Sequence, residues 1–322
     1  MNPSLRTLPI VAIGGSAGAI EPLQRIVGEL PYAFPAVVLI ATHVPPESVS
    51  AMPHILSRSG SLFATHAIDG APLHPSSIIL APPNYHLTVD DGVMRLNQAA
   101  RENGHRPSID VLFRSLAEHG GSISAVLLSG ALDDGVAGMR EVRAAGGRTF
   151  VQDPAEASFP DMPRHAIESG AVDEILATAD IAPALIQFAS DSRDAAVRSN
   201  GIVPADERRD GVPSVFTCPD CGGTLWEMEG DTLRFRCRTG HAFSEASMLA
   251  LHDGMLEAAH WRAIRALEER VDLLRRLAQR AQARNDVRTA DRLGKQAADA
   301  RENIHIIEQA LNAMLARTGR TL

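Results

Sequence analysis

Short apolar runs alternate with amphipathic stretches over residues 1–190, and this alternation predicts the architecture of that part of the chain. Continuous apolar strands separated by helices indicate a parallel sheet covered on both faces. The predicted strands are Ile10–Ile13, Ala36–Ala41, Ser77–Ala81, Ala125–Leu128, Arg148–Gln152 and Glu174–Leu176. The predicted helices are Ile20–Leu30, Ser48–Arg58, Ile109–His119, Gly135–Ala145 and Asp161–Ser169. We therefore expect an α/β domain with a doubly wound, mainly parallel, Rossmann-like sheet. A hairpin, His86–Val89 and Val93–Leu96 around Asp-Gly, interrupts the alternation.

The pattern changes after residue 190. Residues 191–213 are polar and punctuated by Gly and Pro, which is typical of a linker. A small module with closely spaced cysteines follows at 214–243. From 244 to 322, apolar residues recur at spacings of three and four residues. This pattern predicts two amphipathic helices on either side of a break at Asn285-Asp286. Two such helices form either an antiparallel hairpin or a coiled coil that joins two chains into a homodimer.

The first predicted strand ends in a glycine-rich turn, Gly14-Gly15-Ser16-Ala17-Gly18. Between a strand and a helix, small neighbours let a serine sit on a sharp turn with its hydroxyl exposed, as in a nucleophile elbow. A phosphate-binding loop is the rival interpretation, although its G-x-G-x-x-G fingerprint would have Gly where Ser16 stands. A purely structural turn is the third.

Polar residues directly follow other predicted strands, and sites in open α/β sheets form at these carboxyl ends. His43 follows the second strand and Asp134 the fourth. Acyl transfer needs a hydroxyl, an imidazole that activates it and a carboxylate that orients the imidazole, so Ser16, His43 and Asp134 could form a catalytic triad. Each has a plainer interpretation: His43 as a turn residue, and Asp134 as a helix N-cap. Asp133 fits that cap equally well.

Composition and charge narrow the function classes. The 322-residue chain is 45% apolar and has a net charge of −8, so it lacks the basic footprint of nucleic-acid binding. No apolar run is long enough for a transmembrane helix, and the N-terminus has no secretory pattern. We expect a cytoplasmic protein with no nucleic-acid partner.

Six motifs in this order resemble the catalytic domain of the chemotaxis protein-glutamate methylesterases, the CheB family. They are V-A-I-G-G-S-A-G-A, A-T-H-V-P-P, A-P-P-N-Y-H-L, H-R-P-S-I-D-V-L-F-R-S-L-A, L-S-G-A-L-D-D-G-V-A-G-M and Q-D-P-A-E-A-S-F-P-D-M-P-R-H-A-I. The resemblance runs from about residue 8 to residue 188. It implies a serine hydrolase that demethylates glutamate γ-methyl esters of methyl-accepting chemoreceptors and deamidates selected receptor glutamines. It also assigns Ser16 as nucleophile, His43 as general base and Asp134, rather than Asp133, as the orienting carboxylate.

Three departures from the family pattern stand out. Ala17 follows the serine where the receptor enzymes commonly have threonine. Ala131 replaces the methionine of a G-M-G turn at the oxyanion site, although its backbone N–H remains. Only about eight residues precede the first strand, so we expect no receiver domain here, and either constitutive activity or control by a separate regulator or methyltransferase partner.

The resemblance does not decide which residues line the substrate-binding rim of the site. Arg106 is predicted at the substrate rim, because arginine suits carboxylate recognition, and pairing with a surface carboxylate is its alternative. His86 is the second predicted rim residue, and an ordinary turn residue is its plainer interpretation.

The cysteine-rich module predicts a structural zinc site. Cys218-x2-Cys221 and Cys237-x3-His241 supply three thiolates and one imidazole, a closed tetrahedral set. Two short strands, Leu225–Met228 and Leu233–Arg236, lie between the ligand pairs. No catalytic cofactor is expected.

The competing function is a signalling adaptor, in which the triad is vestigial and the zinc and helical tail does the binding. A nucleotide-binding domain is disfavoured, because the position expected for a ribose-binding carboxylate holds Thr42-His43.

Overall fold

The computed structural model describes residues 8–47, 50–195, 211–228 and 232–317. The chain divides into two units, Met1–Met248 and Leu249–Leu322. The first unit therefore includes the cysteine-rich module, and the second consists of residues from Leu249 onward.

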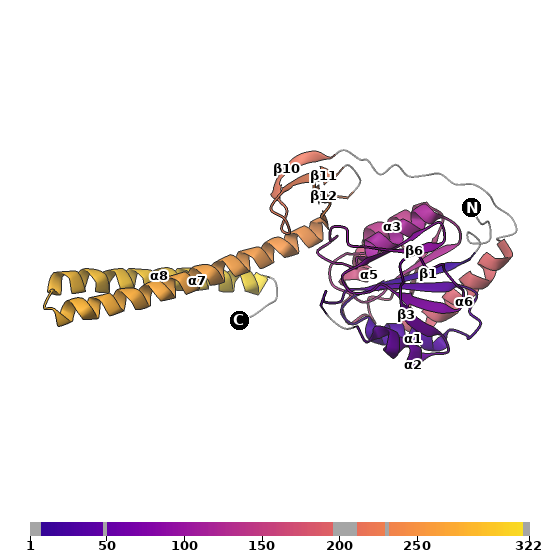
Figure 1. The fold of residues 1–322 in the computed structure, drawn as a ribbon, viewed down its shortest axis with the longest axis horizontal. Coiled ribbons are helices and arrows are strands. Elements are labelled where there is room, and N and C mark those ends of the chain that lie inside the picture. The colour runs from indigo at the N-terminus through magenta and orange to yellow at the C-terminus, as the bar shows by residue number, and fades with distance from the viewer. Residues whose placement is uncertain (1–7, 48–49, 196–210, 229–231, 318–322) are drawn as a thin grey trace. The chain divides into compact units, whose positions relative to one another are not determined.

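A seven-stranded parallel sheet forms the centre of the first unit (Figure 1), and it confirms the doubly wound architecture. Its strands are β1 (Ile10–Gly15), β2 (Val37–Thr42), β3 (Phe63–His66), β4 (Ser77–Leu80), β7 (Ile123–Leu127), β8 (Arg148–Gln152) and β9 (Glu174–Leu176). Their order is β3-β4-β2-β1-β7-β8-β9. The chain moves outward from β1 in both directions, so the switch point, where ligands bind in such sheets, lies beside β1.

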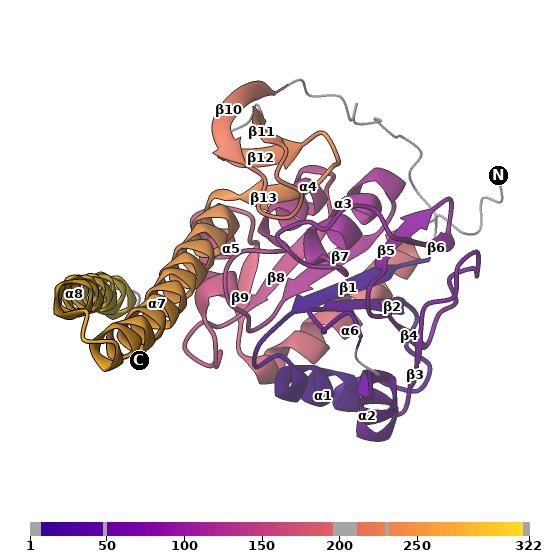
Figure 2. The ribbon, with the colours of Figure 1, turned by 60° about the vertical axis from the view of Figure 1, so that its left-hand side comes forward.

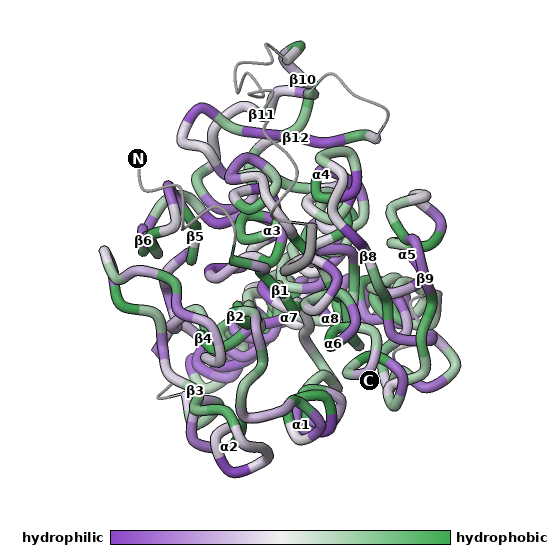
Figure 3. The backbone as a smooth tube through the Cα atoms, turned by 90° about the vertical axis from the view of Figure 1, so that its right-hand side faces the viewer, coloured by the Kyte–Doolittle hydropathy of each residue, from purple (hydrophilic) through white to green (hydrophobic). Residues whose placement is uncertain are grey.

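Helices cover both faces of this sheet (Figure 2), because its strands are apolar on both sides. Ile10 and Ala12 pack beneath α3 (Ile109–His119), α4 (Val136–Ala144) and α5 (Asp161–Glu168). Val11 and Ile13 pack on the opposite face under α1 (Ile20–Glu29), α2 (Met52–Ser59) and α6 (Thr178–Ala195). Figure 3 shows apolar stretches in green on α1 and α3.

The differences from the predicted elements have local causes. The edge strand β3 was not predicted, because it is short and its Phe63 is 71% exposed. Helix α6 was missed as well; it contains Pro183 and runs past the expected boundary at residue 190 to Ala195. Helix α2 begins at Met52, and residues 48–49 of the predicted helix lie outside the described residues.

The predicted hairpin is present as β5 (His86–Asp90) and β6 (Val93–Asn97). Asp91 and Gly92 both have positive φ, 48° and 75°, as a two-residue turn of this kind requires.

The cysteine-rich module is a four-stranded antiparallel sheet, which we call the ribbon. Its strands are β10 (Val212–Thr217), β11 (Thr224–Met228), β12 (Arg234–Cys237) and β13 (Ala242–Ser244). The two central strands match the prediction, and the outer two are additional. Val212 and Pro213, placed in the linker by their composition, belong to β10. Residues 196–210 of that linker lie outside the described residues.

Two long helices, α7 (Glu245–Ala283) and α8 (Val287–Arg317), form the helical pair (Figure 1). Ile264 packs against Leu311 and Leu315 near the end of α8, so the helices are antiparallel. The break falls at Asn285 and Asp286 as predicted, and the Asp286 carboxylate accepts a hydrogen bond from the Thr289 N–H at 3.1 Å. The coiled-coil homodimer stays a prediction. Within the described residues, no helix is long and apolar enough to cross a membrane.

Candidate active site

Ser16 lies immediately after β1, on the turn that leads into α1. Its N–H donates to the Ser129 carbonyl at 2.9 Å, and the Ser129 hydroxyl donates to the Ala17 carbonyl at 2.8 Å. Gly18 has a φ of +76°, which glycine adopts without strain. The loop after β7 thus holds a sharp turn at the carboxyl end of β1. Ser16 is half-buried on this turn.

His43 is hydrogen-bonded to Ser16 on one side and to Asp134 on the other, although the three residues follow three different strands. The His43 Nδ1 is 3.0 Å from the Ser16 Oγ. The His43 Nε2 is 2.7 Å from the Asp134 Oδ2. An ionised carboxylate only accepts, so Nε2 carries the proton and Nδ1 is left to accept from the serine hydroxyl. The two ring nitrogens are exchanged relative to a chymotrypsin-type triad, but the roles that the geometry permits are the same.

Asp134 is held by the N-terminus of α3 rather than capping the helix that follows it. Its carboxylate accepts from the Ile109 N–H at 2.8 Å, the Asp110 N–H at 3.2 Å and the Ser108 hydroxyl at 2.8 Å. Burial alone would raise the pKa of Asp134, but the hydrogen bond with His43, its positive charge and the Ile109 N–H hold that pKa well below its usual range. The helix N-terminus favours the same charged form.

Asp110, in the first turn of α3, in turn caps the N-terminus of α4. Its Oδ1 accepts from the Gly135 N–H at 3.1 Å and the Gly138 N–H at 2.7 Å. Burial, and then the nearby Asp134, raise the pKa of Asp110 to about 7. Each aspartate therefore caps the other's helix, and the two buried carboxyl groups face one another across the helix starts.

Sequence reasoning did not single out several residues that complete this arrangement. Asn103 donates its side-chain N–H groups to Asp110 and Asp134, both at 3.1 Å. His105 stacks on His43 with the ring planes 8° apart, and burial followed by the charge of His43 lowers the pKa of His105 to about 4. Asn103 and His105 flank a glycine in a loop without periodicity. The sequence signal that could have pointed to Asp110 as a helix cap is its place, with Ser108, at the start of a predicted helix.

Ala17 directly follows Ser16 in the chain, and Ala131 follows the turn residue Gly130; their role as oxyanion donors stays a prediction. Both are exposed, and within the described part of the chain neither N–H donates to a protein acceptor. The turn before Ala131 comes close to the serine: a Cβ on Gly130 would lie 3.1 Å from the Ser16 Cβ. Both amide groups are therefore candidates for the predicted oxyanion site.

The two predicted rim residues have other partners. Arg106 donates to the Asn84 side chain at 2.8 and 3.1 Å and to the carbonyls of Gln98 and Ala99 at 2.9 and 2.6 Å. These bonds tie Arg106 to neighbouring loops. His86 is buried instead of lying at a rim, because its Nε2 bonds to the Ala100 carbonyl at 3.1 Å and its Nδ1 accepts from the Ser108 N–H at 3.3 Å. Burial lowers the pKa of His86 and favours its neutral form.

Asp133 takes no part in the triad. Its carboxylate accepts hydrogen bonds from the hydroxyls of Ser244 and Ser247, at 2.7 and 3.3 Å. The adjacent aspartates therefore divide their contacts: Asp134 faces His43, and Asp133 holds the end of the ribbon.

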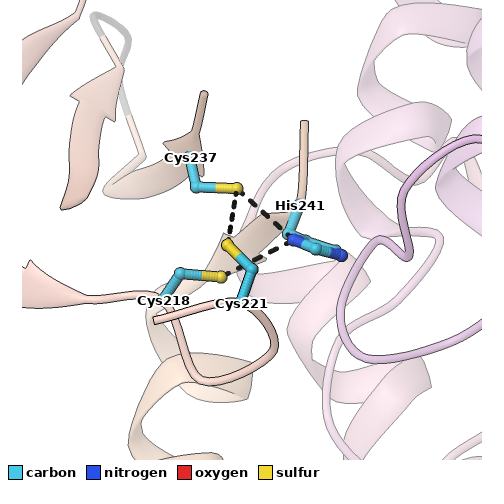
Figure 4. Close-up of side chains that lie close together, drawn as sticks. All are labelled: Cys218, Cys221, Cys237 and His241. Carbon is cyan, nitrogen blue, oxygen red and sulfur yellow. Dashed lines mark hydrogen bonds between the residues drawn. The ribbon is translucent and has the colours of Figure 1, made fainter. Parts of the chain in front are cut away.

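Cys218, Cys221, Cys237 and His241 converge in the ribbon (Figure 4), with their ligand atoms all within 4.8 Å of one another. The His241 Nδ1 is 3.7 Å from the Cys218 sulfur and 3.4 Å from the Cys237 sulfur, and the sulfurs of Cys221 and Cys237 are 3.7 Å apart. Metal–sulfur bonds of about 2.3 Å in a tetrahedron put neighbouring sulfurs about 3.8 Å apart. The cluster therefore has the size and donor set of a tetrahedral metal site.

Comparison with known proteins places these features in a family. A family model described as CheB methylesterase matches residues 11–185. The protein-glutamate methylesterase/protein-glutamine glutaminase 2 of Pseudomonas aeruginosa is 39% identical over 193 residues, which cover 58% of this chain and 55% of that protein. A protein of the same name from Rhodospirillum rubrum is 35% identical over 175 residues, covering 53% of this chain and 48% of its own.

One solved structure supports the same family. The crystal structure of the Thermotoga maritima CheB methylesterase catalytic domain superposes with a TM-score of 0.54 and 30% identity, covering 56% of this chain and 98% of that chain. The chain spans about half the length of the curated relatives it matches. The family match ends at residue 185, before the ribbon and the helical pair.

Proposed function

This chain belongs to the CheB methylesterase family, and from that premise we propose that it is a serine hydrolase acting on glutamate γ-methyl esters of methyl-accepting chemoreceptors. The observation that carries the proposal is the Ser16–His43–Asp134 chain of hydrogen bonds at the switch point of the sheet. The names of the relatives support the substrate class.

In the proposed reaction His43 accepts the Ser16 proton at Nδ1 as the Ser16 Oγ attacks the ester carbonyl. The bond from Oγ to carbon forms, and the carbonyl electrons move to an oxyanion, which the N–H groups of Ala17 and Ala131 hold. Collapse breaks the bond between carbon and the methoxy oxygen, and His43 returns the proton so that methanol leaves. Asp134 stabilises the imidazolium throughout.

Deacylation repeats these steps with water. His43 takes a proton from water, the hydroxide attacks the acyl-enzyme, and the product is the free glutamate carboxylate with Ser16 regenerated. A primary amide would follow the same course with ammonia as the leaving group, so we propose glutamine deamidation at the same site. The relatives' names include this second activity.

The test is methanol release from a methylated chemoreceptor, compared between the wild type, Ser16→Ala and Ser61→Ala. Ser61 is an exposed serine remote from the site in sequence and serves as the matched control. We expect release by the wild type and Ser61→Ala, and a loss of about a thousand-fold or more in Ser16→Ala. Equal release by wild type and Ser16→Ala would refute the mechanism. Receptor binding without any release would support the adaptor function instead.

We also propose that the Cys3His cluster of the ribbon holds a structural zinc ion. Three thiolates and one imidazole leave no open position, and the separations given above match a tetrahedron. The Nε2 of His241 lies 4.0 Å from a carboxylate oxygen of Asp220, a neighbour of the kind that orients metal-bound imidazoles. Elemental analysis of purified protein should find about one zinc per chain in the wild type and far less in Cys237→Ser. Equal metal content in both would contradict this site.

A further inference from the structure

The end of the ribbon is bonded to the residues that hold Asp134. The Asn103 N–H donates to the Ala242 carbonyl at 2.8 Å, and the Ser244 N–H donates to the Asn103 side-chain oxygen at 3.1 Å. The same Asn103 side chain donates to both Asp110 and Asp134. One buried amide therefore bonds to strand β13 on one side and to the catalytic and capping carboxylates on the other.

The ribbon also brings a positive charge to this cluster. Arg234 of β12 contacts Glu102 at 2.6 Å and lies 3.7 Å from Asp110. Arg114 of α3 contacts the other oxygen of Glu102, also at 2.6 Å. Glu102, Asp110 and Asp134 are all buried, so three carboxyl groups face two guanidinium groups. One of those two charges comes from outside the region that matches the family.

We propose that the ribbon is a positioning element of the active site, in which Asn103 fixes the Asp134 carboxylate and Arg234 balances the charge of the acidic cluster behind it. This inference rests on the proposed esterase function for its kinetic test. It assigns the ribbon a part in catalysis without direct contact with the substrate. Asn103 and Arg234 are positioning residues, because they act through Asp134 and Asp110.

Loss of the Arg234 charge should change the pH dependence of kcat/KM. The titratable and charged groups around Asp134 and Arg234 come from several elements. They are His43 after β2, His86 of β5, Arg101, Glu102, His105 and Arg106 of the loop before α3, Asp110 and Arg114 of α3, Asp133, Glu141 of α4, and Arg234 of β12. Removing one positive charge from this set favours the protonated, less negative state of the Asp134–His43 pair. Both must lose a proton for His43 to act as base, so the acid limb of kcat/KM moves to higher pH.

The experiment compares Arg234→Gln, Arg234→Lys and Arg236→Gln in the full chain. Arg236 lies on the same strand but is exposed, so it controls for charge and strand propensity. We expect Arg234→Gln to move the acid limb of kcat/KM for methanol release up by about one pH unit. Arg234→Lys retains the charge and should keep the wild-type limb, as should Arg236→Gln. Superimposable profiles for Arg234→Gln and wild type, or an equal shift in Arg236→Gln, would overturn the proposal.

Asn103→Ala tests the other contact. We expect kcat to fall about ten- to a hundred-fold with KM little changed, because Asn103 is buried and bonds to Asp134 rather than lining the surface. The circular dichroism spectrum and the metal content of the variant serve as the controls for correct folding. A rise in KM with unchanged kcat would contradict positioning.

An NMR titration of the His43 imidazole in these variants needs no substrate. It separates failure of this inference from failure of the proposed function. A His43 pKa that rises in Arg234→Gln and not in Arg236→Gln supports positioning even where no ester is cleaved. An unchanged His43 pKa in an active Arg234→Gln enzyme refutes positioning and leaves the esterase function intact.

Discussion

The imidazoles of His43 and His105 stack face to face, with ring centroids 3.5 Å apart and planes 8° apart. Parallel rings at this distance limit rotation of His43, whose other constraints are its bonds to Ser16 and Asp134. Because burial and the nearby His43 lower the pKa of His105 to about 4, His105 is neutral at pH 7 and would not repel the imidazolium of the proposed reaction.

We therefore expect His105→Phe to retain most activity, because a flat, neutral ring preserves the stack. His105→Ala should lower kcat about ten-fold, since His43 gains freedom to leave its line with Ser16. His74→Ala removes an exposed histidine and is the control. Methanol release measures all three variants. Equal loss in the Phe and Ala variants would show that the nitrogen atoms of His105 matter rather than its flat face.

Asp110 gives the stability of the fold a pH dependence of unusual sign. Its folded-state pKa of about 7 lies above the unfolded value, so the folded chain keeps the proton through a range where the unfolded chain has released it. This contribution to stability is full below about pH 4 and is lost as pH rises through about 7.

We expect the free energy of unfolding to fall between pH 5 and pH 8 by on the order of 2 kcal/mol through this group. Asp110→Asn cannot titrate and should lack that part of the slope. The measurement is the Tm of each protein by calorimetry at both pH values. Taking the difference between the two proteins removes the contribution of the other groups, and a difference that is the same at both pH values would contradict the shifted pKa of Asp110.

Metal removal should unfold the ribbon, because four short strands bury too little apolar surface to fold without it. Trp226 of β11 and Trp261 of α7 are the two tryptophans of the chain, so Trp261→Phe leaves Trp226 as the only indole reporter. We expect a chelator to shift the Trp226 emission to longer wavelength and added zinc to reverse the shift. An emission spectrum that changes neither with chelator nor with added zinc would show that the ribbon folds without metal.

Gly130 is needed for close approach rather than for an unusual φ. A Cβ at this position would lie 2.6 Å from the Met162 Cε and 3.1 Å from the Ser16 Cβ. The methionine end can move, but the Ser16 Cβ is fixed by the elbow. Gly130→Ala should therefore displace Ser16 or the neighbouring Ala131 N–H and lower kcat about ten-fold. Gly254→Ala adds a methyl group in open space and is the control. Unchanged activity in Gly130→Ala would show that the turn can move away.

The central sheet could be predicted because β1, β2 and β7 are continuous apolar runs that end in polar residues. Their adjacent carboxyl ends bring Ser16, His43 and Asp134 together over large sequence separations, so strand-end position was a usable signal. The support around Asp134 was beyond reach, because Asn103 and His105 belong to a loop whose path depends on tertiary contacts. The burial of His86 was missed for the same reason: a histidine at a strand start looks alike whether it faces water or the Ala100 carbonyl.

The ribbon illustrates a different limit. The spacing of Cys218, Cys221, Cys237 and His241 fixed which residues converge, because ligand geometry is local. The docking of β13 against Asn103 could not be predicted, because it depends on single hydrogen bonds between segments far apart in the chain. Sequence reasoning thus identified the four residues that converge and left their connection to Asp134 undetected.

The hydrogen bonds from Ser244 and Ser247 to Asp133, the residue before Asp134, connect the end of the ribbon to the neighbour of the proposed triad. Binding energies that are coupled are coupled in both directions. If metal in the ribbon favours the aligned state of Asp134, then an acyl group or inhibitor held on Ser16 favours retention of the metal by the same factor. Loss of the proposed zinc would then lower esterase activity, and a bound substrate would slow that loss.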